Sequence, residues 1–189
     1  MQQSWRTDRD KLTFISCLTT PDKGEIEPRI ADSADRMIGD VNLFLVEDDN
    51  EEDDDDQNDT DTVSDNHQVQ QLIGEIEIMI ARKDLQRRGY GRATLSTFLW
   101  YVFSRSKEIL DEYAGQADAA CLRYLRVKIG SENARSISLF ESVGFFKVTE
   151  QPNYFGELEL RLKVTERAYE TLRDAKGFEV PESTLYDLQ

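Results

Sequence analysis

The chain has 189 residues, of which 39% are hydrophobic, and its formal net charge is −15. This length suits one globular domain with enough apolar residues for a core. The acidic balance argues against a non-specific nucleic-acid binder, because such proteins neutralise phosphates with an excess of Lys and Arg.

The first third of the chain predicts two strands and an acidic insert. Residues 11–18 and 37–46 are rich in β-formers and are separated by a loop with Pro21, Gly24 and Pro28. Residues 47–65 carry twelve acids and no Lys or Arg, so outside them 23 bases face 26 acids. Such a composition buries too little apolar surface to offset its ordering entropy. We therefore expect residues 47–68 to form a disordered insert between two strands.

Residues 72–81 predict a third strand with two different faces. Ile76, Ile78 and Ile80 alternate with Glu75, Glu77 and Met79, and alternate residues of a strand point to opposite sides of the sheet. A helix over residues 89 to about 110 follows, with an apolar stripe at helical spacing.

The rest of the chain alternates between strands and helices. We expect a strand at 122–129, a helix at 134–143 closed by Gly144, strands at 145–148 and 155–164, and a partly helical tail from residue 165. The order β-β-β-α-β-α-β-β predicts a mixed α/β fold.

Several classes of protein and site are disfavoured by the sequence. No stretch approaches the roughly 18 apolar residues of a membrane span, and the N-terminus has no apolar signal segment. Cys17 and Cys121 sit among apolar neighbours as expected free thiols, and His67 is the one histidine. We therefore expect no metal site and no membrane or nucleic-acid partner. The expected location is the cytoplasm, with the nucleus as an alternative.

A candidate anion site lies between the third strand and the helix after it. Its residues are Gln86, Arg87, Arg88, Gly89, Tyr90, Gly91 and Arg92. A strand–turn–helix directs backbone N–H groups and the positive end of the helix dipole outward, and glycines allow a phosphate to approach closely. An ordinary loop whose glycines start a helix is the alternative. A Rossmann site lacks its third glycine here, and a P-loop lacks its Gly-Lys-Ser/Thr.

A second motif follows the strand at 122–129. Residues 128–145 place Asn133 at a helix start, Ser136 three residues later, then Leu139-Phe140 and Gly144-Phe145. Asn133 as a simple helix cap and Phe140 as a core residue are the alternatives that the residues leave open.

Together the two motifs resemble the cofactor motifs of the GNAT superfamily of N-acetyltransferases, in the same order and in the same strand–helix contexts. Residues 38–45, 74–81 and 158–162 resemble, more narrowly, the N-acetyltransferase 9-like proteins of the RimJ/RimL type. Gln3-Ser4-Trp5 and residues 11–15 fit the same group. The resemblance runs from Gln3 to about residue 165, apart from the acidic insert.

The resemblance implies a GNAT fold, a mixed and mostly antiparallel sheet flanked by helices. It implies an N-acetyltransferase domain at 1–165 with the insert at 47–68, and a C-terminal tail at 166–189. The family begins with a further strand and two helices, so the resemblance also implies an N-terminally truncated version of the fold.

The resemblance further implies acetyl-CoA as the co-substrate. Its phosphates would bind at residues 86–92, and Asn133, Ser136 and Phe140 would lie beside it. The strands ending at Ala81 and Ile129 would splay apart, so that the backbone of Met79, Ile80 and Ala81 pairs with the pantetheine arm and polarises the thioester carbonyl. Phe140 replaces a tyrosine that serves as general acid in many members, which leaves solvent or Tyr154.

The implied reaction is direct transfer of an acetyl group to a primary amine of a protein or peptide, without a covalent enzyme intermediate. Glu77, or Glu75 beside it, would act as general base; a pair of exposed or salt-bridged acids is the alternative. The competing function is a non-catalytic GNAT scaffold that binds CoA or protein partners.

Overall fold

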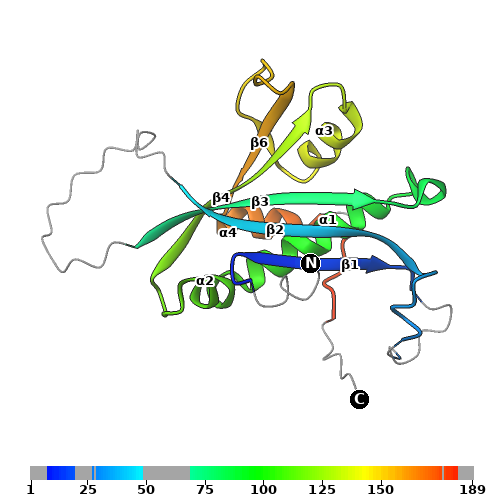
Figure 1. Ribbon diagram of the computed structural model, residues 1–189, viewed down its shortest axis with the longest axis horizontal. Coiled ribbons are helices and arrows are strands. Elements are labelled where there is room, and N and C mark those ends of the chain that lie inside the picture. The colour runs from blue at the N-terminus through cyan, green and yellow to red at the C-terminus, as the bar shows by residue number, and fades with distance from the viewer. Residues whose placement is uncertain (1–7, 20–26, 28, 49–68, 176, 183–189) are drawn as a thin grey trace, which may run out of the picture.

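A computed structural model describes residues 8–19, 27, 29–48, 69–175 and 177–182 (Figure 1). Its six strands form one sheet and are β1 (Lys11–Cys17), β2 (Met37–Glu47), β3 (Gln70–Ile80), β4 (Ala120–Gly130), β5 (Phe146–Lys147) and β6 (Glu157–Lys163). Its helices are the short 3₁₀ helix η1 (Lys83–Leu85) and the α-helices α1 (Tyr90–Ser104), α2 (Ser106–Ala114), α3 (Ala134–Glu141) and α4 (Glu166–Arg173).

The strand order is β1-β2-β3-β4-β6-β5, and all neighbours are antiparallel except β3 and β4. The parallel pairing of β3 with β4 ends at Glu75 and Arg126, although both strands continue. Beyond that point β3 stays paired with β2 through Ile80, while β4 stays paired with β6 through Gly130. The sheet therefore opens between β3 and β4, as predicted, and the two halves diverge (Figure 1).

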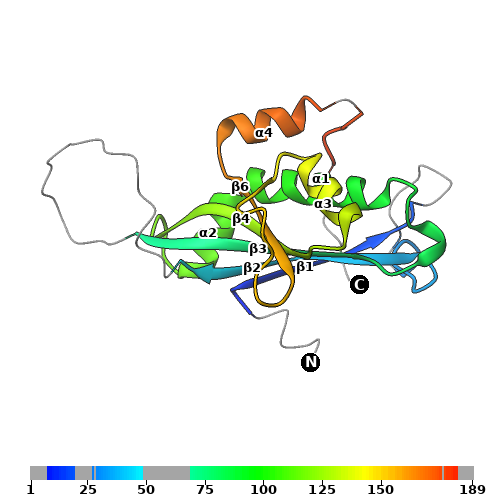
Figure 2. The same cartoon turned by 90° about the horizontal axis from the view of Figure 1, so that it is seen from above.

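Three helices, α1, α3 and α4, lie on one face of the sheet (Figure 2). The core fills the space between them, and fully buried side chains include Leu43 of β2, Leu99 of α1 and Leu160 of β6. Gly74 of β3 makes room for this packing, because a Cβ there would lie 2.6 Å from Cδ2 of Leu125 and 2.8 Å from Cδ1 of Leu43. No described helix covers the opposite face, which we call the open face.

The single helix predicted from residue 89 to about 110 is wrong, because the chain bends at Arg105 between α1 and α2. Ser104 and Ser106 flank the bend, and the Ser104 hydroxyl donates to the Tyr101 carbonyl. Serine hydroxyls compete with helical backbone hydrogen bonds in this way. The apolar stripe gave no sign of the break.

Other predicted boundaries shift by a few residues. Glu47 ends β2, and the Asp48 N–H donates to the Gln71 carbonyl, so the acidic segment begins inside the folded sheet. Residues 49–68 lie outside the described part of the chain. The strand expected from residue 155 begins at Glu157, because Asn153 Oδ1 accepts hydrogen bonds from the N–H groups of Phe155 and Glu157 and holds a turn.

The predicted helical part of the tail is α4, which begins at Glu166 and is capped by Thr165. Among the described residues, no helix is long and apolar enough to cross a membrane.

Candidate active site

The loop before α1 presents the start of that helix to solvent. Arg87 and Gly89 adopt left-handed backbone conformations, with φ of 63° and 89°. Gly89 is the N-cap residue and supplies no side-chain hydrogen bond, and the first turn of α1 contains no acid. The N–H groups of this turn therefore lack a helical partner and add to the positive end of the helix dipole. The geometry suits an anion, as the sequence predicted.

Three contacts fix this loop. Leu85 is buried beneath it. Gln86 Nε2 donates to the Ile80 carbonyl at 2.8 Å, which ties the loop to the end of β3. Arg82 Nη2 lies 2.8 Å from Asp84 Oδ2, and this hydrogen bond lowers the pKa of the Asp84 carboxyl. The Gln86 side chain thus positions the loop through its hydrogen bond to the end of β3.

The second motif begins at Asn133, which caps α3. Its Oδ1 accepts a hydrogen bond from the Ser136 N–H at 3.2 Å, so the capping alternative is confirmed. Its Nδ2 group has no hydrogen bond to another described residue. The cap leaves that donor free for a ligand, so the structural and the binding interpretations of Asn133 are compatible.

The two motifs meet in a groove of about 730 Å³ between α3 and the loop of residues 86–89 before α1, which we call the α1 loop. Of the predicted cofactor residues, the groove is lined by Ile80, Gln86, Arg87, Gly89, Gly91, Arg92, Asn133 and Ser136. Arg135 and Ser138 of α3 also line it and were not predicted. Gly91 forms part of the floor, where a Cβ would sit 3.5 Å from Leu139.

The other predicted cofactor residues lie outside the groove lining. Phe140 is 1% exposed and packs edge to face against Phe145, with ring centroids 5.0 Å apart. The expectation that it lies beside the cofactor is therefore corrected to a core role, the alternative left open above. Met79 points to the open face and is 54% exposed. Arg88, in the loop before α1, and Tyr90, the first residue of α1, do not line the groove.

The backbone of β3 faces the opening in the sheet at alternate residues. The Ala81 N–H donates to the Ile38 carbonyl at 2.8 Å, so it bonds toward β2 and is not available to polarise a thioester. Hydrogen bonds alternate sides along an antiparallel ladder. The backbone of Ile78 and Ile80 therefore points away from β2, toward the gap beside β4. Of the predicted residues Met79, Ile80 and Ala81, only Ile80 therefore has a backbone N–H that points toward the gap and could polarise the thioester. The N–H of Ile78, which was not predicted, points the same way.

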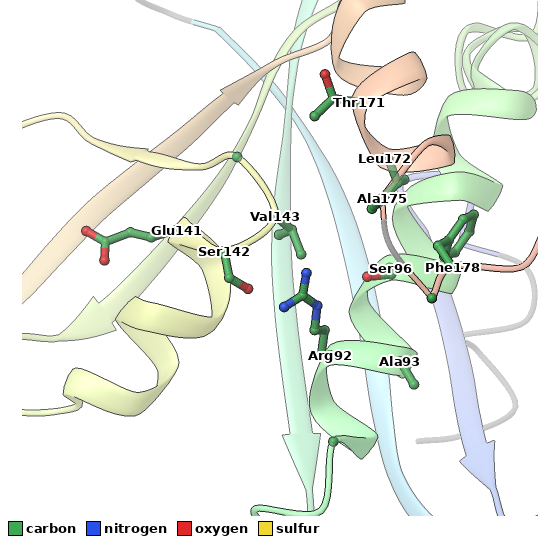
Figure 3. Close-up of a pocket in the computed structure, with 13 residues that line it drawn as sticks. Arg92, Ala93, Ser96, Glu141, Ser142, Val143, Thr171, Leu172, Ala175 and Phe178 are labelled. Atoms are coloured by element: carbon green, nitrogen blue, oxygen red, sulfur yellow. The ribbon is translucent and has the colours of Figure 1, made fainter.

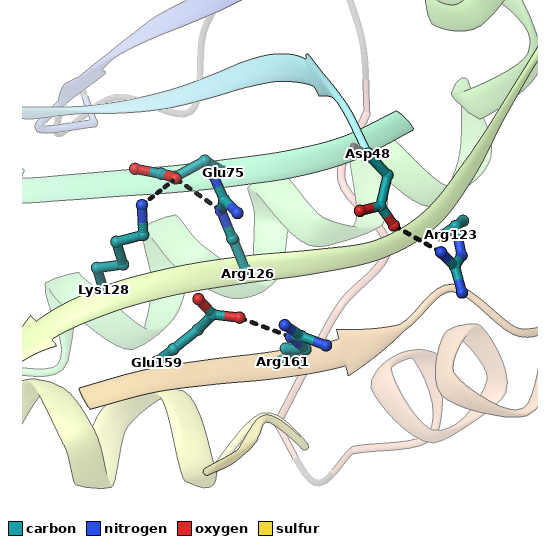
Figure 4. A network of polar contacts seen from close by, with 7 residues as sticks. All are labelled: Asp48, Glu75, Arg123, Arg126, Lys128, Glu159 and Arg161. Atoms are coloured by element: carbon teal, nitrogen blue, oxygen red, sulfur yellow. Dashed lines mark hydrogen bonds and ion pairs between the residues drawn. The ribbon is translucent and has the colours of Figure 1, made fainter. Parts of the chain in front are cut away.

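Glu75 and Glu77 lie on the open face of β3, but they differ in their contacts. Glu75 Oε2 lies 2.7 Å from Arg126 Nε and 3.3 Å from Lys128 Nζ, both on β4 (Figure 4). Glu77 is exposed and makes no ion pair or hydrogen bond with its side chain within the described ranges. The alternative of exposed or salt-bridged acids thus describes both positions, since Glu75 is salt-bridged and Glu77 is exposed, and only Glu77 has a carboxylate without an ion pair in the described part of the chain.

Comparison with known proteins identifies the family. Residues 3–146 match the acetyltransferase (GNAT) domain. The chain belongs to the GNAT acetyltransferase family. The "N-acetyltransferase 9-like protein" of Schizosaccharomyces pombe is 40% identical over 174 residues, which cover 87% of this chain and 76% of that protein. The "Alpha/beta-tubulin-N-acetyltransferase 9" of Drosophila melanogaster is 33% identical and covers 87% of this chain.

The chain spans 64% of the length of the Drosophila protein, which is less than two thirds. Among solved structures, Arabidopsis thaliana NAA60 in complex with acetyl-CoA aligns with a TM-score of 0.50 and 13% identity, over 82% of this chain and 76% of that one. That likeness shows a shared GNAT fold. The predicted fold and family are confirmed, and acetyl-CoA is the cofactor that the family assigns to this acetyltransferase.

Beside Glu77 lies a hydrogen-bonded row of polar side chains around Asn42, which the sequence did not predict. Asn42 of β2 pairs directly with Glu77 and is only 8% exposed. Its Oδ1 accepts from the Thr13 hydroxyl at 2.7 Å, and its Nδ2 donates to Asp40 Oδ2 at 2.8 Å. Asn is disfavoured inside strands, so the presence of Asn42 within the strand predicted at 37–46 could have identified it as a candidate functional residue.

The described residues contain no group of three or more His, Cys, Asp or Glu side chains that could hold a metal ion.

Proposed function

We propose that this GNAT domain transfers the acetyl group of acetyl-CoA to a primary amine of a protein or peptide. The observation that carries the proposal is the opening between β3 and β4. Beside it lie a cationic groove on the helix face and, on the open face of β3, the unpaired Glu77. Donor and acceptor can thus approach one gap from opposite faces of the sheet.

The groove fits the charge and shape of the donor. Arg87, Arg92 and Arg135 supply positive charge, and the uncapped first turn of α1 supplies N–H groups for a diphosphate. Ile78 and Ile80 give the groove an apolar lining beside β3, and their backbone points toward the gap between β3 and β4. Acetyl-CoA, when bound, supplies the activated acetyl group; the residues here hold and orient it.

Direct transfer requires an uncharged amine. The amine nitrogen bonds to the acetyl carbon, the carbon–sulfur bond breaks, and the nitrogen loses its proton. We propose that Glu77 accepts this proton, directly or through water, because its carboxylate is unpaired, whereas Oε2 of Glu75 contacts both Arg126 and Lys128. A backbone N–H of Ile78 or Ile80 would stabilise the negative charge on the carbonyl oxygen.

The leaving thiolate needs no dedicated acid in this proposal. Phe140 has no hydroxyl and is buried, and a thiol with a pKa near about 8.5 leaves tolerably as thiolate. Tyr154, in the loop before β6, is 96% exposed, so its phenol remains available at the end of the sheet where β4 also ends.

A protein or peptide amine is the proposed acceptor class. The Drosophila relative carries the name of a tubulin N-acetyltransferase, which supports a protein substrate for this chain. The exposed aromatic pair Tyr154 and Phe155 offers apolar surface beside the strand ends for a peptide.

A peptide-library acetylation assay with labelled acetyl-CoA tests the proposal. We expect turnover on peptides with a free amine and loss of turnover when the amine is blocked. Saturable CoA binding without turnover on any amine would favour the non-catalytic scaffold instead. Absence of CoA binding would refute the proposed function as a whole.

A further inference from the structure

The two faces of the sheet differ in charge around β3. On the helix face, the groove adjoins a second cavity of about 490 Å³, and Gly89 and Arg92 line both spaces (Figure 3). The guanidinium of Arg92 projects between the end of α3 and α4 there. On the open face, by contrast, Asp40 of β2 and Glu77 of β3 are acids on neighbouring strands. A cationic acceptor is therefore attracted to the open face and repelled from the helix face.

Asp40 lies between two exposed apolar side chains. It pairs directly with Ile15 of β1 and Met79 of β3, which are 53% and 54% exposed. Phe14 packs on Phe98 of α1, so its neighbour Ile15 points to the open face, because alternate residues of a strand point to opposite sides of the sheet. Ile15, Asp40 and Met79 thus form a row across three strands, which we call the Asp40 row.

The Asp40 carboxylate is held from one side. Its Oδ2 accepts a hydrogen bond from Asn42 Nδ2 at 2.8 Å, and Asn42 Oδ1 accepts in turn from the Thr13 hydroxyl. Asn42 is buried, so this support is itself packed into the sheet. Within the described ranges, Asp40 Oδ1 has no hydrogen bond or ion pair. The sheet therefore fixes the carboxylate and leaves one oxygen for a ligand.

The cations around this part of the sheet are engaged elsewhere. Lys11 Nζ lies 4.9 Å from the centroid of an aromatic ring of β2. Arg36 Nη2 donates to a main-chain carbonyl at 2.9 Å. Arg126 and Lys128 contact Glu75 (Figure 4). In the described part of the chain, the carboxylate of the Asp40 row therefore has no ion-pair partner.

A carboxylate between two apolar side chains is the complement of a Lys or Arg side chain. Each of these has an apolar stem that prefers apolar surface and a charged head. The stem would lie on Ile15 and Met79, and the head would donate to Asp40 Oδ1. The flexible thioether of Met79 adapts to either stem.

The position of Asp40 relative to Glu77 fits an acceptor peptide. Asp40 pairs with Met79, and Glu77 lies two residues before Met79, so the two acids are diagonal neighbours. Diagonal neighbours on an antiparallel pair are about 7–8 Å apart. An extended peptide spans about 3.3–3.6 Å per residue. An acceptor whose amine reaches Glu77 therefore passes Asp40 about two residues further on.

We propose that the open face selects acceptors with a basic residue within about two residues of the acetylated amine, and that Asp40 is the specificity-determining residue. The inference rests on the proposed function and deepens it, because it narrows the acceptor from any protein or peptide amine to one followed by Lys or Arg. Asn42 is the residue that positions Asp40.

Acetylation of matched peptides by the whole chain tests this assignment. The peptides carry a free N-terminal amine and, at position 2 or 3, either Arg or citrulline, which has the shape of Arg without its charge. Asp40→Asn removes the negative charge but keeps an oxygen that accepts from Asn42. Glu112→Gln removes an exposed acid of α2 and is the matched control for a loss of charge.

For the wild type, we expect a kcat/KM at least fivefold higher for an Arg peptide than for its citrulline counterpart. The difference should lie in KM, because both peptides present the same amine to Glu77. Asp40→Asn should bring the ratio to within twofold of one, whereas Glu112→Gln should keep the wild-type ratio. Asp40→Lys should reverse the preference, so that a peptide with Glu at this position is acetylated faster than the Arg peptide.

Two results would overturn the inference and leave the proposed function standing. One is equal kcat/KM for the Arg and citrulline peptides in the wild type, and the other is a wild-type ratio in Asp40→Asn. A wild-type chain that acetylates no amine at all would overturn the proposed function and this inference with it.

Discussion

Replacing Glu75 and Glu77 one at a time gives a paired test of the proposed base. The two carboxylates are neighbours on one strand face, but loss of Glu77 should lower kcat, whereas loss of Glu75 should lower stability. Glu77→Gln removes the proposed base and no ion pair. General-base catalysis contributes about 10²–10⁴-fold, so kcat should fall at least 100-fold, equivalent to about 2.7 kcal/mol. Because Glu77 is exposed, its replacement should change the free energy of unfolding by less than about 0.5 kcal/mol.

Glu75→Gln should show the reverse pattern. Its carboxylate lies between Arg126 and Lys128, with side chains of 23%, 19% and 37% exposure, so these ion pairs are intermediate between surface and buried ones. Losing the charge also leaves two cations facing each other. We expect a cost of about 1 kcal/mol, or roughly 2–4 °C in Tm for a chain of this size, with kcat within threefold of wild type.

Steady-state kinetics, together with thermal denaturation, separates the two residues. Glu77→Gln should lose kcat and keep its Tm, and Glu75→Gln should keep kcat and lose Tm. Wild-type kcat in Glu77→Gln would remove this residue from the mechanism. Equal losses of kcat in both variants would refute the assignment of distinct roles.

Three further predictions follow from single contacts. Gly74→Ala should lower stability by about 1–3 kcal/mol in thermal denaturation, since its Cβ would overlap two buried leucines, whereas Gly130→Ala, with nothing within 4 Å, should not destabilise. Gln86→Ala should weaken CoA binding about fivefold in titration through loss of one hydrogen bond of about 1 kcal/mol, while Gln70→Ala, on an exposed contact, should bind normally. Asn133→Ala should lower the free energy of unfolding by about 1 kcal/mol through loss of the helix cap, whereas Asn133→Ser should retain the cap and the stability. Wild-type CoA affinity in Asn133→Ser would show that the residue is a cap alone.

Local sequence determined most elements of this protein and the two segments of its proposed cofactor site. Strand β3 could be predicted because its alternation of isoleucines and acids is a property of consecutive residues. The α1 loop and the start of α3 were likewise identifiable, since glycines at a turn and Asn at a helix start have local conformational causes. The family resemblance then placed these segments in a GNAT fold, which the comparisons confirm.

Tertiary structure alone decided how neighbouring residues divide their roles. Glu75 and Glu77 are equivalent in the sequence pattern, and only the approach of Arg126 and Lys128 from β4 separates them. Phe140 is likewise assigned to the core by its contact with Phe145, not by its motif. The packing of α4 on α1, in which Tyr169 contacts Phe103, likewise joins segments that lie far apart in the sequence. Such pairings depend on the path of the whole chain, so no local pattern encodes them.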